Sequence, residues 1–249
     1  MDGLNYVSIC LTVLFCNIIA GVAGFGGNIL ALPFLSFLAP LSIITPVLLV
    51  VALFNNTARA VLYYKYLRWD ILAFTIGWML VGAMIGGNFL VEVPEEYAKL
   101  VLAVFAVGIS LKNLYRMFKK GSVKVLGKPL QSVMLFCAGT FQFAFACGGP
   151  FLAVYLAARL EEKNEIRAMQ MAAFLIISIL GFARSAINGG YTPQVIKLSI
   201  LILPVLLLAV LISEKIVKRV DNVLFKKIVY LMLLVAGSIM GIESLGQII

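Results

Sequence analysis

Residues suited to binding an anion recur in this sequence at nearly constant spacing. Gly26-Gly27 is followed 122 residues later by Gly148-Gly149, and Arg59 is followed 125 residues later by Arg184. A glycine turn that opens a helix presents free backbone N–H groups and the positive end of the helix dipole. A guanidinium holds oxyanions in a bidentate manner and keeps its charge. The pattern therefore predicts reversible recognition of a small anion.

Each glycine pair is expected to begin a helix inside an apolar region. Asn28 follows the first pair as the expected N-cap, and Pro150 follows the second pair in a position that suits a first helical turn. Irregular backbone of this kind is tolerated at membrane depth only where protein buries it or where it lines a watery cavity. The alternative is that the glycines serve only close helix packing.

The two arginines lie within apolar segments, where each costs about 2.5–3.5 kcal/mol on insertion scales. Arg59 is about six residues from the inner end of its segment, and Arg184 is a similar distance from the outer end of its own. One interpretation is that they supply a cation at each end of an anion path. The alternative is that both side chains snorkel to the membrane interfaces.

Amide side chains near these features complete the expected site. Asn55 and Asn56 lie about one helical turn before Arg59, and Gln142 and Gln170 are the corresponding residues of the second half. Each amide could instead form an ordinary interhelical hydrogen bond. The predicted substrate-binding residues are Gly26, Gly27, Asn28, Asn55, Asn56, Arg59, Gln142, Gly148, Gly149, Pro150, Gln170 and Arg184.

The acidic residues and histidines argue against an enzyme. The chain has no histidine, and its 11 acidic residues fall in loops or near segment ends. A buried proton relay, a catalytic dyad and a metal site of the usual kinds therefore lack candidates. Its four cysteines have no CxxC spacing and are expected to be small buried hydrophobic residues. We expect no enzymatic activity, no cofactor and no metal.

The elements that must position these residues are membrane helices. The chain has 249 residues, of which 63% are hydrophobic and 12% are charged, and its mean hydropathy is +1.07. At roughly 20 residues per crossing, eight to ten crossings would use nearly the whole length. The net charge of +9 resides in short loops, so it indicates membrane orientation and not nucleic-acid binding.

The segments repeat in order and length. Apolar segments are expected near 4–24, 28–40, 45–64, 70–91 and 97–117, and again near 130–146, 150–158, 167–188, 195–213 and 223–242. We therefore predict a first repeat at 1–118, a basic cytoplasmic linker at 119–129 and a second repeat at 130–249. Each repeat is expected to contain a Gly-Gly-hinged helical hairpin and three transmembrane helices.

Loop charges predict the orientation of the chain in a cell (inner) membrane. The linker 119–129 carries four lysines, and 214–227 carries five Lys and Arg residues, so both are expected in the cytoplasm. Counting membrane crossings from these loops is consistent only if each short segment joined at a Gly-Gly pair enters and leaves the membrane on the same side. Each half then has an odd number of crossings. The fold class expected is an all-α polytopic membrane protein with two inverted repeats and with both termini outside.

At these residues the sequence resembles the sulfite exporter (TauE/SafE) family of membrane transporters. The resemblance rests on Gly24-Phe25-Gly26-Gly27-Asn28 with the apolar run to Pro33, and on the repetition of the pattern. The second turn departs from it, since it reads Cys147-Gly148-Gly149-Pro150 and has Tyr155 where the first half has Pro33. What the resemblance implies is a carrier that moves small sulfur-containing anions such as sulfite, sulfoacetate or other sulfonates, usually outward.

The function expected is therefore secondary transport of such anions by alternating access. The alternatives are a passive anion channel, a carrier of a non-sulfur carboxylate, and a structural subunit of a larger membrane complex. The partners expected are a small anionic substrate and the lipid bilayer, without nucleic acid, and a homodimer is left open.

Overall fold

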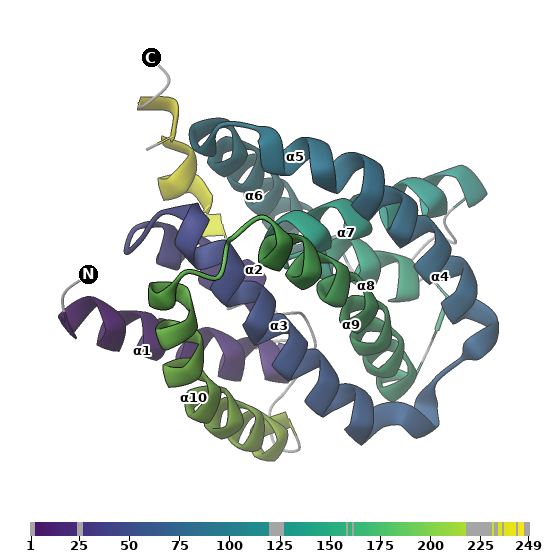
Figure 1. The fold of residues 1–249 in the computed structure, drawn as a ribbon. Helices are drawn as coiled ribbons and strands as arrows, with labels where there is room; N and C mark the ends of the chain where they lie inside the picture. Colours follow the sequence, from purple (N-terminus) through teal and green to yellow (C-terminus); the bar gives the residue numbers. More distant parts are fainter. Residues whose placement is uncertain are drawn as a thin grey trace.

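The computed structural model describes residues 3–23, 27–119, 127–157, 159–160 and 162–217, together with 231, 234–235, 237–242 and 244–246. The described chain is helical and contains no strand, as predicted (Figure 1). Its elements are α1 (Gly3–Ala23), α2 (Asn28–Ser36), α3 (Leu41–Tyr63), η1 (Tyr64–Tyr66), α4 (Trp69–Gly82), η2 (Ala83–Gly87), α5 (Asn88–Glu92), α6 (Glu95–Lys119), α7 (Lys128–Phe145), α8 (Gly149–Ala157), α9 (Lys163–Ile187) and α10 (Pro193–Val217).

Two short helices follow the glycine pairs. Helices α2 and α8 have nine residues each, which corresponds to about 13.5 Å of length. The hydrocarbon core of a bilayer is about 30 Å thick, so neither helix can cross it alone. The prediction of a short second segment in each half is confirmed, although α2 ends at Ser36 and not near residue 40.

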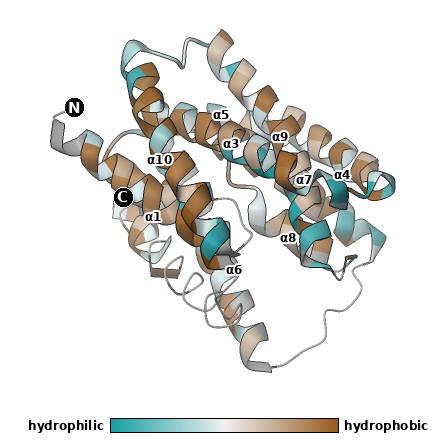
Figure 2. Cartoon of the chain, turned by 90° about the horizontal axis from the view of Figure 1, so that it is seen from below, coloured by the Kyte–Doolittle hydropathy of each residue, from teal (hydrophilic) through white to brown (hydrophobic). Residues whose placement is uncertain are grey.

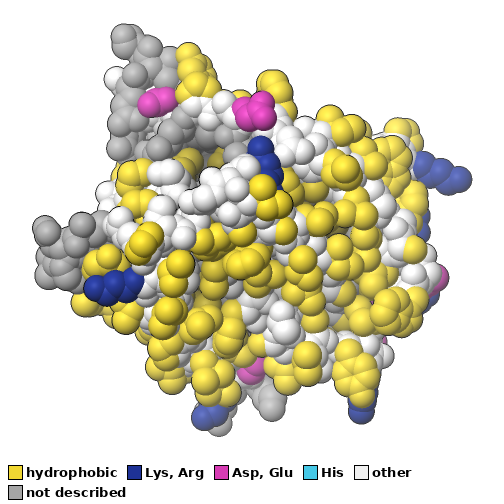
Figure 3. All heavy atoms as spheres, in the orientation of Figure 1, with side chains coloured by type: hydrophobic (Ala, Val, Ile, Leu, Met, Phe, Trp, Pro, Cys, Tyr) yellow, Lys and Arg dark blue, Asp and Glu magenta, His cyan; other side chains and the backbone are white. Residues whose placement is uncertain are grey.

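The outer surface is that of a membrane protein. Four helical segments in the described part of the chain are long and apolar enough to cross a bilayer: Leu41–Tyr66, Trp69–Gly87, Asn164–Ile187 and Pro193–Ile216. Apolar residues run along the helices (Figure 2), and hydrophobic side chains cover most of the face seen in Figure 3. Large apolar side chains such as Trp69, Phe89 and Ile187 are exposed. Such a surface is stable in lipid and would aggregate in water.

The centre of the molecule is an antiparallel pair formed by α3 and α9, which lie side by side in Figure 1. Tyr63, at the end of α3, accepts a hydrogen bond from Arg167 near the start of α9. Tyr191, just after α9, donates one to the Pro46 carbonyl near the start of α3. Arg59 and Arg184 are therefore near opposite ends of this pair.

Two further helix pairs pack beside the α3–α9 pair. The first helix of the first predicted repeat, α1, packs on α10, and the first helix of the second predicted repeat, α7, packs on α4. Both contacts are parallel and close. A Cβ atom on Gly82 of α4 would overlap the carbonyl oxygen of Phe136 in α7, and one on Gly139 of α7 would overlap that of Met79. Small residues thus allow α4 and α7 to approach at backbone distance.

This close approach predicts different effects for two alanine substitutions in α4. Gly82→Ala forces the α7 backbone to move and should destabilise the protein by about 1–3 kcal/mol. Gly77→Ala is the matched control, because a Cβ there meets nothing within 4 Å and alanine favours the helix. Thermal unfolding of detergent-purified protein should show a lower midpoint for Gly82→Ala alone. Equal midpoints for the two variants would contradict the close α4–α7 contact.

Candidate anion-binding site

The first glycine turn is held by asparagines. Gly24, Phe25 and Gly26 lie outside the described residues, and Gly27 immediately precedes α2. A Cβ on Gly27 would overlap Asn17 Oδ1 of α1, so only glycine fits there. Asn17 Oδ1 in turn accepts a hydrogen bond of 2.7 Å from Asn55 Nδ2 of α3. Asn55 is thus connected to the first turn through Asn17.

The prediction that Asn28 caps α2 is wrong. Gly27 occupies the cap position, no side chain caps the helix, and Asn28 is the first helical residue. Its side chain instead donates a hydrogen bond of 2.8 Å to the Leu48 carbonyl of α3. That carbonyl lies within reach because α3 packs on α2. Asn28 therefore anchors the short helix to its neighbour.

The second glycine turn is held by a glutamine. Helix α7 ends at Ala146, which is left-handed with φ 54°, and α8 begins at Gly149. Gly148 N donates to Gln142 Oε1 at 3.1 Å, and Gln142 Nε2 donates to Ser178 Oγ of α9 at 2.9 Å. The predicted free amide at Gly148 is therefore already occupied. As predicted, Pro150 lies in the first turn of α8, and its side chain is outside the described part.

The two turns are held by a layer of polar side chains across the middle of the protein. This polar layer consists of Asn17, Asn55, Asn56, Gln142, Gln170 and Ser178. Asn56 Nδ2 is 3.5 Å from Ser178 Oγ, so Asn56 reaches the second turn as Asn55 reaches the first. Gln170 Nε2 donates to the Gly149 carbonyl at 3.4 Å, while its buried Oε1 has no hydrogen-bond partner. These amides form interhelical hydrogen bonds, which was the alternative interpretation of each. Their role as substrate ligands stays a prediction.

Arg59 is buried where α1, α3, α9 and α10 converge. Its side chain is 5% exposed, its Nη2 donates to Ser213 Oγ at 3.3 Å, and its Nε lies 4.0 Å from Glu214 Oε1. The neighbouring Tyr63 hydroxyl donates to Glu214 Oε2 at 2.9 Å. Arg59 thus has an interior partner and does not snorkel.

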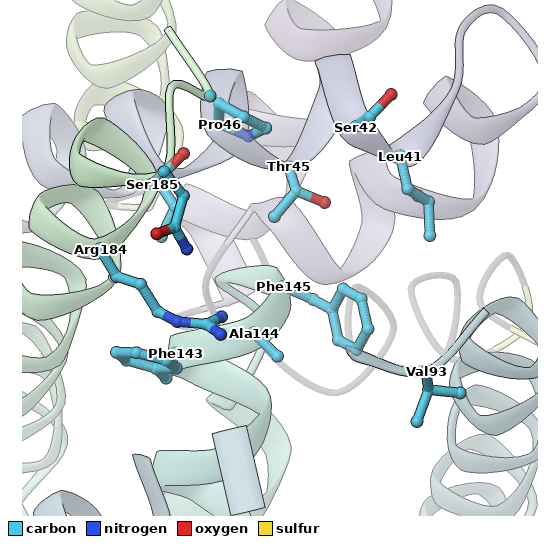
Figure 4. Close-up of a pocket in the computed structure, with 14 residues that line it drawn as sticks. Leu41, Ser42, Thr45, Pro46, Val93, Phe143, Ala144, Phe145, Arg184 and Ser185 are labelled. Atoms are coloured by element: carbon cyan, nitrogen blue, oxygen red, sulfur yellow. The ribbon is translucent and has the colours of Figure 1, made fainter. Parts of the chain in front are cut away.

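Arg184 lies in a cavity of about 350 Å³ at the other end of the α3–α9 pair. Figure 4 shows its side chain extending from α9 along the ring of Phe143, with Thr45 of α3 across the cavity. The guanidinium carbon is 5.7 Å from the centre of that ring. The cavity is lined by Leu41, Ser42, Thr45, Pro46, Leu49, Val93, Phe143, Ala144, Phe145, Gly181, Arg184, Ser185, Asn188 and Gly190.

The lining combines one cation with neutral hydrogen-bonding groups and apolar walls. Within the described chain, the Arg184 guanidinium has no ion pair and no hydrogen bond to a protein acceptor, and the lining contains no carboxylate. Ser42 and Asn188 are exposed, so the cavity opens to the surface at this end. A volume of this size suits a small ligand. This arrangement is suited to binding a small oxyanion.

The structure separates the predicted site residues into different places. Among those described, only Arg184 lines the cavity, whereas the amides lie in the polar layer and Arg59 lies beyond it. Sequence reasoning missed Ser42 and Thr45. The available signal was that Ser42 and Thr45 are three residues apart, shortly after Pro40 at the start of a helix, which places them on one helix face.

Gln142 carries a testable part of this arrangement. Gln142→Met keeps the side-chain volume but leaves the buried Gly148 N–H without its acceptor, which should cost about 1–3 kcal/mol. Ser132→Ala is the control, since Ser132 lies at the solvated start of the same helix. Thermal unfolding in detergent should distinguish them. If Gln142→Met unfolds at the wild-type midpoint, the second turn does not depend on this hydrogen bond.

Comparison with known proteins assigns the family. Residues 9–240 match the family model described as sulfite exporter TauE/SafE. No curated protein sequence and no solved structure matches the chain. The family match spans both predicted halves, both short helices and the cavity. It agrees with the multi-pass membrane surface and with a transport role. The chain therefore belongs to the sulfite exporter TauE/SafE family of membrane transporters.

Proposed function

We propose that this protein is a secondary transporter of small sulfur-containing oxyanions, such as sulfite and organic sulfonates, and that the Arg184 cavity binds them. The observation that carries the proposal is a permanently charged guanidinium to which the described residues offer no acceptor, in a cavity where the other polar side chains among those residues are neutral. A sulfonate or sulfite would accept hydrogen bonds from Arg184 and from the nearby hydroxyls. The preference for sulfur anions rests on the family.

The charge distribution supports an orientation. The end of the α3–α9 pair that holds Arg59 also carries Lys65, Arg68, Arg167 and Lys215. Basic residues favour the cytoplasmic side, so this end is proposed to face the cytoplasm. The Arg184 cavity then opens on the opposite side, toward which both termini are proposed to face.

The packing supports alternating access. The cavity is open at its own end of the α3–α9 pair. The polar layer, and then Arg59 with Ser213 and Glu214, lie between the cavity and the opposite end of the pair. The corresponding helices α3 and α9 run antiparallel, and α1–α10 and α7–α4 pack reciprocally. Inverted repeats produce such relations and commonly support rocking of one repeat against the other. A passive channel would need a continuous path through this layer.

Substitution of Arg184 tests the proposal. Arg184→Ala removes charge-assisted hydrogen bonds worth about 1.5–3 kcal/mol, which is a loss of affinity of roughly 10- to 100-fold. Counterflow of radiolabelled sulfoacetate or sulfite in proteoliposomes should fall accordingly, while Arg184→Lys keeps part of it. Arg68→Ala is the matched control, because Arg68 is exposed and paired with Asp70 and Glu165.

Three results would contradict this function. Wild-type transport by Arg184→Ala would remove the cavity from the transport path. Flux that rises without saturation and shows no counterflow would indicate a channel. Competition by acetate or propionate but not by sulfonates would indicate a carboxylate carrier.

A further inference from the structure

At the end of the protein opposite the cavity, the described structure gathers positive charge around the buried Arg59. Arg59 and Arg167 meet there, and Glu214 is the carboxylate that the described structure places against Arg59. Arg167 Nη2 donates to the Gly21 carbonyl at 2.6 Å, and its Nη1 donates to the Tyr63 hydroxyl at 2.8 Å. Both acceptors are neutral, so one carboxylate faces two guanidinium groups.

The ion pair at this end is incomplete. Arg59 Nε and Glu214 Oε1 are 4.0 Å apart, and neither atom has a hydrogen-bond partner although both are buried. Glu214 is held instead through its other oxygen, by the Tyr63 hydroxyl at 2.9 Å. The carboxylate therefore offsets part of the positive charge without making the close bidentate contact that a guanidinium and an oxyanion prefer.

The surrounding helices are shaped around the guanidinium. A Cβ on Gly21 of α1 would overlap Arg59 Nη2, so the absence of a side chain there leaves room for the charged group. Ser213, next to Glu214 on α10, accepts from the same Nη2 at 3.3 Å. Arg59 is thus fixed by α1 and α10, while its Nε stays available on the side of Glu214.

We propose that Arg59 and Arg167 form a second oxyanion site, and that the Glu214 carboxylate occupies it as an internal substitute when no transported anion is present. This inference rests on the proposed function, because the ligand is the same class of small sulfur oxyanion. The first site is the Arg184 cavity, at the opposite end of the α3–α9 pair.

The exchange has a mechanical consequence. Glu214 joins α10 to α3 beside the Ser213–Arg59 hydrogen bond, so an anion that replaces Glu214 at Arg59 weakens that connection. Separating the helices without an anion would leave the buried Arg59 uncompensated, which is strongly unfavourable. The second site should therefore open toward its own side only when an anion is present. Such a rule prevents the empty carrier from leaking.

Anion stoichiometry in Glu214→Gln tests this inference. Equilibrium dialysis of the detergent-purified full chain, at radiolabelled methanesulfonate concentrations that fill the cavity but do not displace Glu214, should give one bound anion in the wild type and two in Glu214→Gln. The double variant Arg184→Ala/Glu214→Gln should retain one, because only the cavity site is lost. Glu165→Gln is the control; it also removes a carboxylate near this end, one that pairs with the exposed Arg68. This control should bind one anion.

The outcomes separate the two proposals. If Glu214→Gln binds only one anion and Arg184→Ala/Glu214→Gln binds none, the second site is wrong and the cavity stands. If Arg184→Ala still binds one anion and Arg184→Ala/Glu214→Gln binds no more than that, the cavity assignment fails and so does the inference that depends on it.

A milder variant covers failure of Glu214→Gln to fold. Tyr63→Phe keeps every charge but removes the hydroxyl that holds Glu214 Oε2 and receives Arg167. It should expose the second anion-binding event at high methanesulfonate concentration. A single binding event at all concentrations in Tyr63→Phe would overturn the second site.

Discussion

The structure depends on satisfying the backbone of two helix breaks inside a membrane protein. A break exposes N–H and C=O groups that lipid cannot satisfy, so neighbouring side chains must do so. Gln142 accepts from the Gly148 amide and Gln170 donates to the Gly149 carbonyl, while Asn28 anchors α2 to α3. Because Asn55 and Asn56 are adjacent on α3, one helix serves both turns. The polar layer is thus a requirement of the two short helices.

Along the α3–α9 pair, the polar layer separates two ends of the protein that differ in their surroundings. Arg184 lies on the side where the cavity is open, and its charge has no protein counter-ion in the described structure. Arg59 lies on the other side, where Glu214 and Ser213 enclose it. The two residues occupy matching positions in the sequence, yet one is accessible and the other is closed. A carrier captured with access on one side would have this asymmetry.

The sequence predicted an all-helical chain and the two short segments because hydropathy and glycine turns are local properties. Most of the segment expected near 223–242 lies outside the described residues. The sequence also singled out Arg59 and Arg184, since an arginine in an apolar segment is conspicuous in any single chain. It could not show which residues of other helices the amides would bond, because Gln142 and Ser178, for example, are 36 residues apart and meet only through packing. The capping role expected of Asn28 failed for the same reason, because its side chain donates to the distant Leu48 carbonyl and does not accept from local backbone N–H groups.

Long-range pairing also explains why the sequence did not predict the contact between Glu214 and Arg59. From the sequence it is one of several acidic residues near a segment end, and 154 residues separate Ser213 beside it from Arg59. In the fold it faces a guanidinium across a gap that leaves an atom of each group without a hydrogen bond. A permanently charged arginine cannot relieve such a contact by losing its proton. The relief available is a better oxyanion, and in a transporter of anions the substrate itself supplies one.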